Sequence, residues 1–182
     1  MASEHQYRSR RSIRLQGYDY SWPGWYYVTV CVRDRQCVLG KVIADKIGLN
    51  QFGEVTQKCW EWLPRQYSYV ELDDFVIMPN HIHGIIIING LPRRGGSRTA
   101  PTEAKPKSLG RLIGAFKTTS TKEINTIRRT PGGVFWQRGY YEHIIRNDRD
   151  LYNIRQYISN NPLQWAIDVE NQECSALSSG YT

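Results

Sequence analysis

The stretch that most constrains the fold is MPNHIHGIIII, residues 78–88, in which Pro79 and Asn80 lead into a run of β-forming residues. Such a run favours a strand, and the dipeptide before it predicts a short turn. Side chains on a strand alternate between two faces, so His81 and His83 point to one face and Ile82 to the other. That geometry suits two imidazoles that bind one metal ion. It equally suits two polar groups on a solvent-exposed sheet face.

Strand and helix patterns alternate along the rest of the chain. Runs rich in β-branched and aromatic residues predict strands over 25–32, 69–79, 81–89 and 134–147, the last of these with a bend at Gly139. Apolar residues at helical spacing predict a helix over 50–66 that frays at Pro64. A second helix follows Ser108 and ends before TPGG at 130–133. A third covers 150–161, with a cap at Asn147 or Asp148 and an end near Pro162.

The order of these elements predicts the fold class. Strand, helix, strand, strand, helix, strand, helix is the pattern of an α+β protein with a ferredoxin-like split βαβ (βαββαβ) antiparallel sheet, helices on one face and an additional C-terminal helix. The 182 residues fit one domain, and 40% hydrophobic content is enough for a core. Within this domain we expect a basic N-terminal arm over 1–20, a flexible basic loop over 90–108 and a polar tail over 167–182.

Targeting signals and cysteines favour a cytoplasmic protein without a membrane partner. No run approaches the ~18 apolar residues that span a bilayer, and the opening MASEHQYRSRRSIRL lacks the apolar centre of a secretory signal. The four cysteines, at 31, 37, 59 and 174, form no CxxC pair. This spacing argues against a zinc knuckle and a disulfide scaffold, so we expect four reduced thiols.

Positive charge is concentrated in one segment. Of the formal net charge of +7, a balance of +8 lies between Gly90 and Thr130, where ten Lys or Arg residues face two Glu residues. Concentrated positive charge attracts a polyanion, and the six Trp and twelve Tyr offer stacking surfaces for unpaired bases, although most of these rings belong to an ordinary core. A solvated basic loop and helix face that only aid solubility is the alternative.

The last predicted helix carries two polar groups on its apolar face. In IRQYISNNP, Ile154, Tyr157, Ile158 and Asn161 fall at i, i+3, i+4 and i+7 and therefore share one face. The isoleucines turn this face toward the body of the protein, so a phenol and an amide oxygen can converge on the histidine pair. A core tyrosine and a helix C-cap asparagine are the alternative.

Taken together, MPNHIHG on a strand, a basic helix, FWQRGYYEHIIRN, and QYISNNP on a final helix resemble the single-tyrosine HUH transposases, and most closely those associated with repetitive extragenic palindromes (REP). The resemblance covers most of the chain, from RSIRLQGYDY to about residue 166. It implies that His81, His83 and Asn161 bind a divalent metal ion, Mg or Mn, and that Tyr157 is the catalytic nucleophile. Tyr152 points about 140° away on the helix, which favours a single nucleophile.

The function that this resemblance implies is cleavage and rejoining of single-stranded DNA, at hairpin-forming sequences, through a 5′-phosphotyrosine intermediate. The enzyme would act as a monomer or a homodimer. The basic segment supplies the predicted DNA-binding residues Arg93, Arg94, Arg98, Arg111, Lys117 and Lys122. Two alternatives remain from the residues alone, a noncatalytic nucleic-acid-binding module and a metal-dependent phosphodiesterase that activates water.

Overall fold

The computed structural model describes residue 15 and the ranges 17–90 and 106–165. Most of the three segments predicted as arm, loop and tail lies outside these ranges. The elements are, in chain order, β1 (Gly24–Cys31), the short 3-10 helix η1 (Arg33–Arg35), β2 (Gly40–Ile43), β3 (Lys46–Leu49), α1 (Gln51–Gln66), β4 (Val70–Ile77), β5 (His81–Ile88), α2 (Leu109–Arg128), β6 (Tyr141–Ile145) and α3 (Asp148–Gln164).

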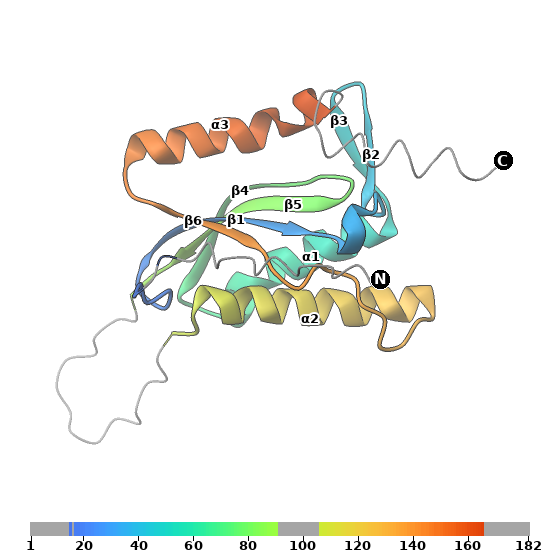
Figure 1. Cartoon of the computed structure of the whole chain (residues 1–182), viewed down its shortest axis with the longest axis horizontal. Coiled ribbons are helices and arrows are strands. Elements are labelled where there is room, and N and C mark those ends of the chain that lie inside the picture. Colours follow the sequence, from blue (N-terminus) through green and yellow to red (C-terminus); the bar gives the residue numbers. More distant parts are fainter. Residues whose placement is uncertain (1–14, 16, 91–105, 166–182) are drawn as a thin grey trace, which may run out of the picture.

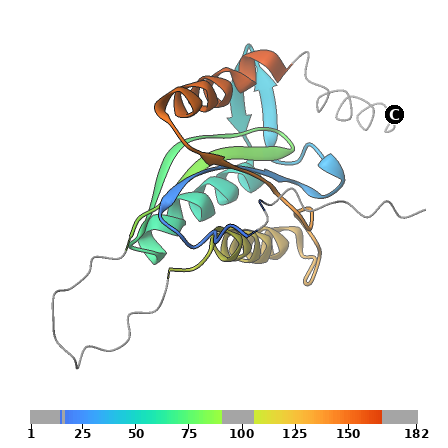
Figure 2. The ribbon, with the colours of Figure 1, turned by 60° about the vertical axis from the view of Figure 1, so that its left-hand side comes forward.

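The main sheet has four antiparallel strands in the order β4-β5-β1-β6. β5 inserts between β1 and β4, the two strands that α1 connects, which is the split βαβ arrangement. Figures 1 and 2 show α1 and α2 on one face of the sheet and α3 alone on the other. The predicted fold class is therefore confirmed, with α3 as the additional C-terminal helix.

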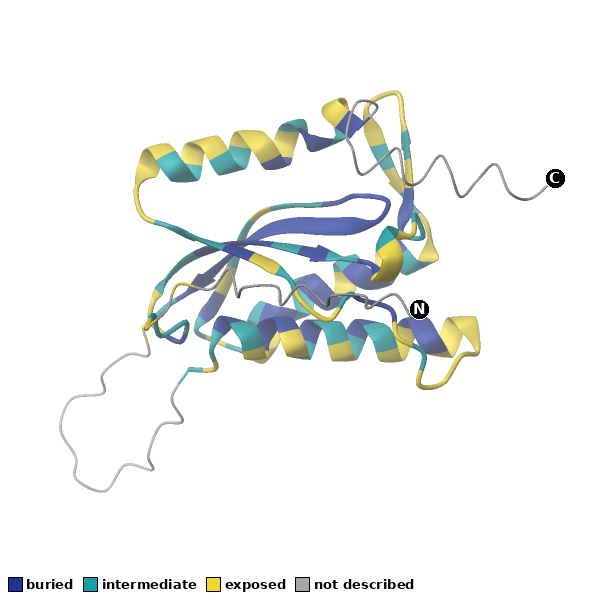
Figure 3. Ribbon diagram, viewed as in Figure 1, coloured by how far each residue is buried: buried dark blue, intermediate teal, exposed yellow. Residues whose placement is uncertain are grey.

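β5 is buried along its whole length, as the continuous dark strand in Figure 3 shows. Its even-numbered residues face α1 and α2, where Ile82, Ile86 and Ile88 join the larger core with Trp60 and Phe116. On the same face, Gly84 leaves room for the Trp60 indole, because a Cβ there would lie 2.7 Å from an indole carbon.

The opposite face of the sheet carries a smaller apolar cluster under α3. Tyr27 of β1, Ile85 of β5 and Ile158 of α3 form its buried centre. The odd-numbered residues of β5 point to this face, and these include both histidines.

The structure adds a hairpin that the sequence patterns did not predict. β2 and β3 pair with Ile43 opposite Lys46, so only Ala44 and Asp45 form the turn. Both have positive φ angles, 48° and 61°. A two-residue turn of this kind usually contains Asn or Gly, and alanine there gives no hairpin signal.

One predicted helix end and one predicted strand are wrong in extent. α1 ends at Gln66, as predicted, with Pro64 inside it, whereas α3 continues beyond Pro162 to Gln164. Each proline lies in the last turn of its helix, where few backbone hydrogen bonds remain to be lost. β6 is shorter than the predicted 134–147, because the chain leaves the sheet around Gly139 and only Trp136, before it, bridges to Val32.

The prediction of four reduced thiols is wrong for Cys37, which is disulfide-bonded. Cys31 and Cys59 are free, and burial raises the pKa of the Cys59 thiol to about 12. Spacing along the chain does not reveal such a bond, since a disulfide depends on distance in the folded protein. Cys174 lies outside the described residues.

Within 15, 17–90 and 106–165, no helix combines the length and the apolar character needed to cross a bilayer.

Gly84→Ala should destabilise the fold by ~1–3 kcal/mol, because the added methyl group overlaps the Trp60 ring and displaces it or the strand. The measurement is the free energy of unfolding from urea titration. Gly114→Ala is the matched control. No atom lies within 4 Å of its new Cβ, so removing a helical glycine should stabilise α2 by ~0.5–1 kcal/mol. Equal stability of the Gly84 variant and the wild type would contradict the packing of Trp60 on β5.

Candidate active site

Two buried imidazoles meet at the start of β5. His81 and His83 are 2% and 5% exposed, and their Nε2 atoms lie only 2.8 Å apart. Their register partners on β1 are Cys31 and Thr29, so all four side chains occupy the face toward α3. The alternative of two polar groups on a solvent-exposed sheet face therefore does not hold. The Nε2 atoms of the two histidines point toward each other.

The far nitrogen of His81 is held by its sequence neighbour. His81 Nδ1 lies 2.6 Å from Oδ1 of Asn80, whose side chain is fully buried. An amide oxygen can only accept, so the proton is on Nδ1 of His81. The Nε2 lone pair of His81 is then available toward His83.

The far nitrogen of His83 faces two hydroxyl groups of β1. Nδ1 lies 2.8 Å from the Tyr27 hydroxyl and 2.9 Å from Thr29 Oγ1, and Thr29 donates to Tyr27 over 3.1 Å. Hydroxyl groups can accept from Nδ1 or donate to it, so this pair supports either tautomer of His83. Burial is the main reason that the pKa of His83 is well below its usual range, with the His81 imidazole adding to it. His83 is consequently neutral at neutral pH.

α3 brings Tyr157 and Asn161 to the histidines. The Tyr157 hydroxyl lies 3.5 Å from His83 Nε2, and the side chain is 46% exposed. Two turns further along, the Trp165 ring lies 6.1 Å from the His81 ring, centroid to centroid. Asn161 lies midway between these two contacts on the same helix face, so it faces the histidine pair. The helix face that Tyr157 and Asn161 share therefore covers the histidine pair.

Asn161 has an unsatisfied oxygen. The residue is 2% exposed, and its Oδ1 atom has no hydrogen-bond partner within the described part of the chain. A buried acceptor without a partner costs about 1–3 kcal/mol, and such atoms occur where a ligand completes the site. Two imidazole nitrogens and one amide oxygen are a donor set that a divalent cation accepts. Asp and Glu add nothing here, since the described residues contain no cluster of three or more His, Cys, Asp or Glu.

Side-chain pairs fix α3 on both edge strands of the sheet. Toward β4, Arg155 binds Asp73 with two parallel hydrogen bonds, 2.8 Å from Nε to Oδ1 and 2.6 Å from the terminal nitrogen to Oδ2. The Arg155 guanidinium accordingly lowers the pKa of Asp73. Between the edges, Leu151 and Ile154 pack on the cluster centred on Tyr27.

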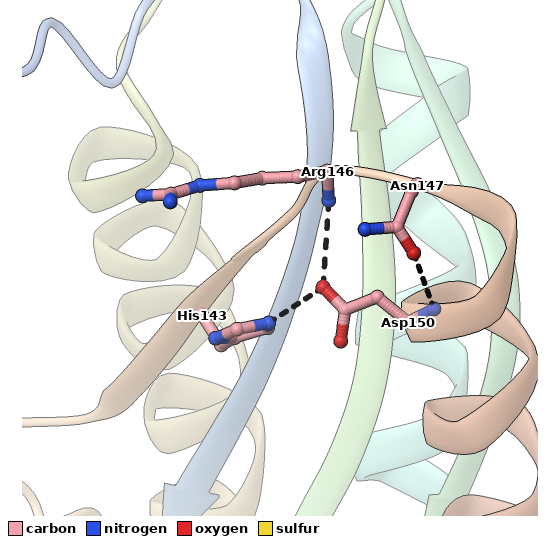
Figure 4. A network of polar contacts seen from close by, with 4 residues as sticks. All are labelled: His143, Arg146, Asn147 and Asp150. Carbon is pink, nitrogen blue, oxygen red and sulfur yellow. Dashed lines mark hydrogen bonds and ion pairs between the residues drawn. The ribbon is translucent and has the colours of Figure 1, made fainter.

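The second attachment joins the first turn of α3 to β6, as Figure 4 shows. Asp150 Oδ2 lies 2.8 Å from His143 Nε2 and accepts from the Arg146 backbone N–H over 3.4 Å. Asn147 caps the helix by accepting from the Asp150 N–H over 2.9 Å. The attachments to β4 and β6 together determine where Tyr157 lies over the histidines.

Tyr152 does not share the site. It is 63% exposed, and the helix turns by about 140° between it and Tyr157. Of the two tyrosines in α3, Tyr157 is the one whose hydroxyl lies by the histidines.

The residues predicted to bind DNA are spread over α2 and beyond it. Arg93, Arg94 and Arg98 lie outside the described residues. Arg111 is near the N-terminal end of α2, beside a small hollow that Asp19 also lines, whereas Lys122 is exposed near the other end.

The ammonium group of Lys117 is already bound by the protein. It donates to the carbonyls of Gln137 and Gly139 over 2.8 and 2.7 Å. Burial lowers its pKa to about 8. This position gives Lys117 a role in shaping the segment before β6.

Sequence patterns missed the residues that orient the histidines. Asn80 stands in the turn before β5, and Tyr27 and Thr29 alternate on β1. Their role depends on the β1–β5 register, which no pattern within one strand specifies. The alternation of Tyr27, Thr29 and Cys31 was the only available signal, because it places these three on one strand face.

Comparison with known proteins finds relatives that cover most of the chain. No family model matches the chain. An uncharacterised protein of Haemophilus influenzae (strain Rd) is 38% identical over 168 residues, which cover 87% of this chain and 91% of that protein. A second protein of the same organism, named "Putative REP-associated tyrosine transposase", is 26% identical over 155 residues, covering 80% and 74%.

Among solved structures, that of a REP-associated tyrosine transposase bound to a REP hairpin superposes with a TM-score of 0.56. It is 19% identical and covers 83% of this chain and 73% of that chain. The fold is therefore shared with this transposase.

Loss of the Arg155–Asp73 pair should loosen α3. Arg155→Gln should speed amide hydrogen exchange in α3 about two- to five-fold, the effect expected of a partly exposed ion pair, while α2 stays unchanged. The pKa of Asp73 is lowered in the folded protein. The difference in α3 exchange rate between Arg155→Gln and the wild type should therefore be largest above pH ~4 and disappear as the pH falls through that lowered pKa.

Arg149→Gln is the control for this measurement, because it removes the same charge from an exposed position of the same helix. Equal acceleration by both variants would show that the charge of α3, and not the contact with β4, holds the helix.

Proposed function

Because the chain belongs to the same family as the 38% identical Haemophilus protein and is similar to the REP-associated tyrosine transposases in sequence and fold, we propose that it is an HUH single-tyrosine DNA nicking and strand-transfer enzyme. The observation that carries this proposal is the Tyr157 hydroxyl, 3.5 Å from His83 Nε2 and beside a converging pair of imidazoles. A phenol held over a polar centre, yet open to solvent, is suited to act as a nucleophile.

Metal dependence follows from the chemistry of the donor set. His81, His83 and Asn161 would hold the ion, Mg or Mn, and the orphaned Asn161 oxygen supports this assignment. A divalent cation at this position would polarise a phosphodiester as a Lewis acid and orient it. Asn80 supports His81, and the two β1 hydroxyl groups support His83, so that both Nε2 lone pairs can point to one place.

Tyr157 would carry the covalent step. Its oxygen attacks the phosphorus, the Tyr157 O–P bond forms, and the bond to the 3′ oxygen of the preceding nucleotide breaks. Since both Nε2 atoms would bind the ion, the phenol proton leaves to solvent, which reaches the half-exposed side chain, and solvent gives a proton to the departing 3′ oxygen. The products are a 5′-phosphotyrosine and a free 3′-hydroxyl. Attack by another 3′-hydroxyl reverses the step and joins strands without ATP.

The proposed substrate is single-stranded DNA that contains a hairpin. The structurally similar transposase is described as bound to a REP hairpin, and the basic residues of the 90–130 segment offer charge complementarity to DNA. A cytoplasmic location and a monomeric or homodimeric state remain predictions.

Two other functions explain the site less well. A noncatalytic nucleic-acid-binding module gains nothing from burying two imidazoles and an unsatisfied amide oxygen, which is costly. A phosphodiesterase that activates water leaves the placement of Tyr157 over His83 without a function.

The proposal predicts a covalent adduct. Incubation with end-labelled single-stranded hairpin DNA and Mn²⁺ should give a protein–DNA species that survives denaturant, and peptide mapping should place it on Tyr157. Tyr157→Phe removes one oxygen, so the adduct should disappear while DNA binding persists.

Tyr152→Phe is the matched control and should form the adduct normally, because Tyr152 points away from the histidines. Cleavage by the Tyr157 variant would identify water or another residue as the nucleophile. Activity on blunt duplex alone would contradict the proposed substrate.

Metal binding can be measured without catalysis. In calorimetric titration with Mn²⁺, Asn161→Ala should weaken binding by at least about tenfold, because it removes one proposed ligand. Asn160→Ala is the control, since the preceding side chain points about 100° away on the helix and should leave affinity unchanged. Equal affinity of wild type and Asn161→Ala would remove Asn161 from the metal site.

A further inference from the structure

A second concave site lies on the far side of the sheet from Tyr157. The C-terminal half of α2, over 117–129, and the segment 131–138 enclose a groove of about 740 Å³, here named the α2 groove. It is distinct from the histidine site, because α2 and α3 cover opposite faces of the sheet (Figures 1 and 2). None of the residues assigned to catalysis lines it.

The walls of the α2 groove are fixed by hydrogen bonds between side chains and the facing segment. Asn125 Nδ2 donates to the Gly133 carbonyl over 2.7 Å, and Trp136 Nε1 donates to Ser120 Oγ over 2.9 Å. At the end nearest β6, Lys117 binds two carbonyls of the same segment. The groove is therefore formed before any ligand binds.

Positive charge surrounds the α2 groove. Lys122, Arg129 and Arg138 line it and are exposed, and no Asp or Glu is among its lining residues. Glu123, next to Lys122, is close enough to Cys59 of α1 to add to the effect of burial in raising the pKa of that thiol. Such a surface selects a ligand with several negative charges.

The floor of the groove is apolar. Phe135 and Trp136 lie buried beneath it, while Val134 is 57% exposed on the wall. Threonine hydroxyls at 118 and 121 add hydrogen-bond donors that suit phosphate oxygens. Cationic rims over an apolar floor match the backbone and the unstacked bases of a single strand, whereas the base faces of a duplex are stacked inside it.

One wall of the groove is hydrogen-bonded to β1 beside the histidine site. The Gln137 N–H donates to the Cys31 carbonyl over 2.9 Å, and Cys31 is the register partner of His81. The wall of the groove therefore meets the sheet at the end where His81 begins β5. A strand that crosses this edge passes from one site to the other.

We propose that the α2 groove binds single-stranded DNA that flanks the segment cleaved at Tyr157, and that Lys122, Arg129 and Arg138 hold its phosphates. This assignment rests on the proposed function for the identity of the ligand. Lys117 acts differently, because it shapes the groove and does not contact DNA.

The charge contacts can be counted from the salt dependence of binding. The test uses the full chain carrying Tyr157→Phe, in EDTA, with a hairpin oligonucleotide that has single-stranded flanks. Adding Lys122→Ser, Arg129→Asn and Arg138→Ser should reduce the slope of log affinity against log salt by about 2, since each lost phosphate contact contributes ~0.7. Asparagine is used at 129 because that residue has a φ of 56°.

A control with the same change in net charge separates local contact from general attraction. Lys41→Ser, Lys46→Ser and Lys58→Ser remove three exposed charges elsewhere and should leave the slope within about 0.5 of the parent. Equal reductions in the two triple variants would overturn the groove assignment.

Crosslinking locates the strand. Val134→p-benzoylphenylalanine should crosslink to the single-stranded flank on irradiation, and the same replacement at Ile43, which is 70% exposed on the β2–β3 hairpin, should not. A crosslink to the hairpin stem, or none at 134, would overturn the proposal. Neither assay requires cleavage, so the two proposals can fail separately. Absence of a Tyr157 adduct would refute the proposed function and leave DNA binding in the α2 groove open to test. A normal adduct with no crosslink at 134 would refute the groove proposal and leave the proposed function standing.

Discussion

The architecture depends on the complete burial of β5. Strands flank it on both sides, α1 and α2 cover one face, and α3 covers the other. Every polar group on β5 must therefore find a partner inside the protein. Two imidazoles on such a strand are costly unless their four nitrogens are satisfied. Asn80 is the partner of Nδ1 in His81, and Tyr27 and Thr29 are the partners of Nδ1 in His83, so the two Nε2 atoms are left facing each other 2.8 Å apart.

The two faces of the sheet differ in how much they contribute to stability. The face toward α1 and α2 holds the large core with Trp60, Phe116 and the even-numbered isoleucines of β5. The face toward α3 has a buried centre of only three residues, and charged or polar pairs at both edges supplement it. Because so little apolar area holds α3, its opening costs less than global unfolding. The helix that carries Tyr157 is thus the part of the site best able to adjust to a strand of DNA.

Periodicity revealed those features that depend on neighbours along the chain. The alternation in HIHG placed His81 and His83 on one face, and the helical spacing in IRQYISNNP placed Tyr157 with Asn161. What periodicity could not reveal depends on contacts between distant segments. Tyr27 and Thr29 contact His83 because of the β1–β5 register. Lys117 binds the carbonyls of residues 137 and 139 because that segment lies beside α2. Likewise, the β2–β3 turn uses Ala44 in a conformation that alanine seldom adopts.

Pro162 shows how the site influences local structure. Its position predicted the end of α3, yet the helix continues to Gln164 and Trp165 is buried beside His81. The longer helix brings Trp165 to His81, and Asn161, one turn earlier, is buried with an oxygen that has no partner among the described residues. A proposed ion that binds this oxygen would recover the desolvation cost and stabilise α3 in its docked position, so that ion binding and placement of the nucleophile become one linked equilibrium.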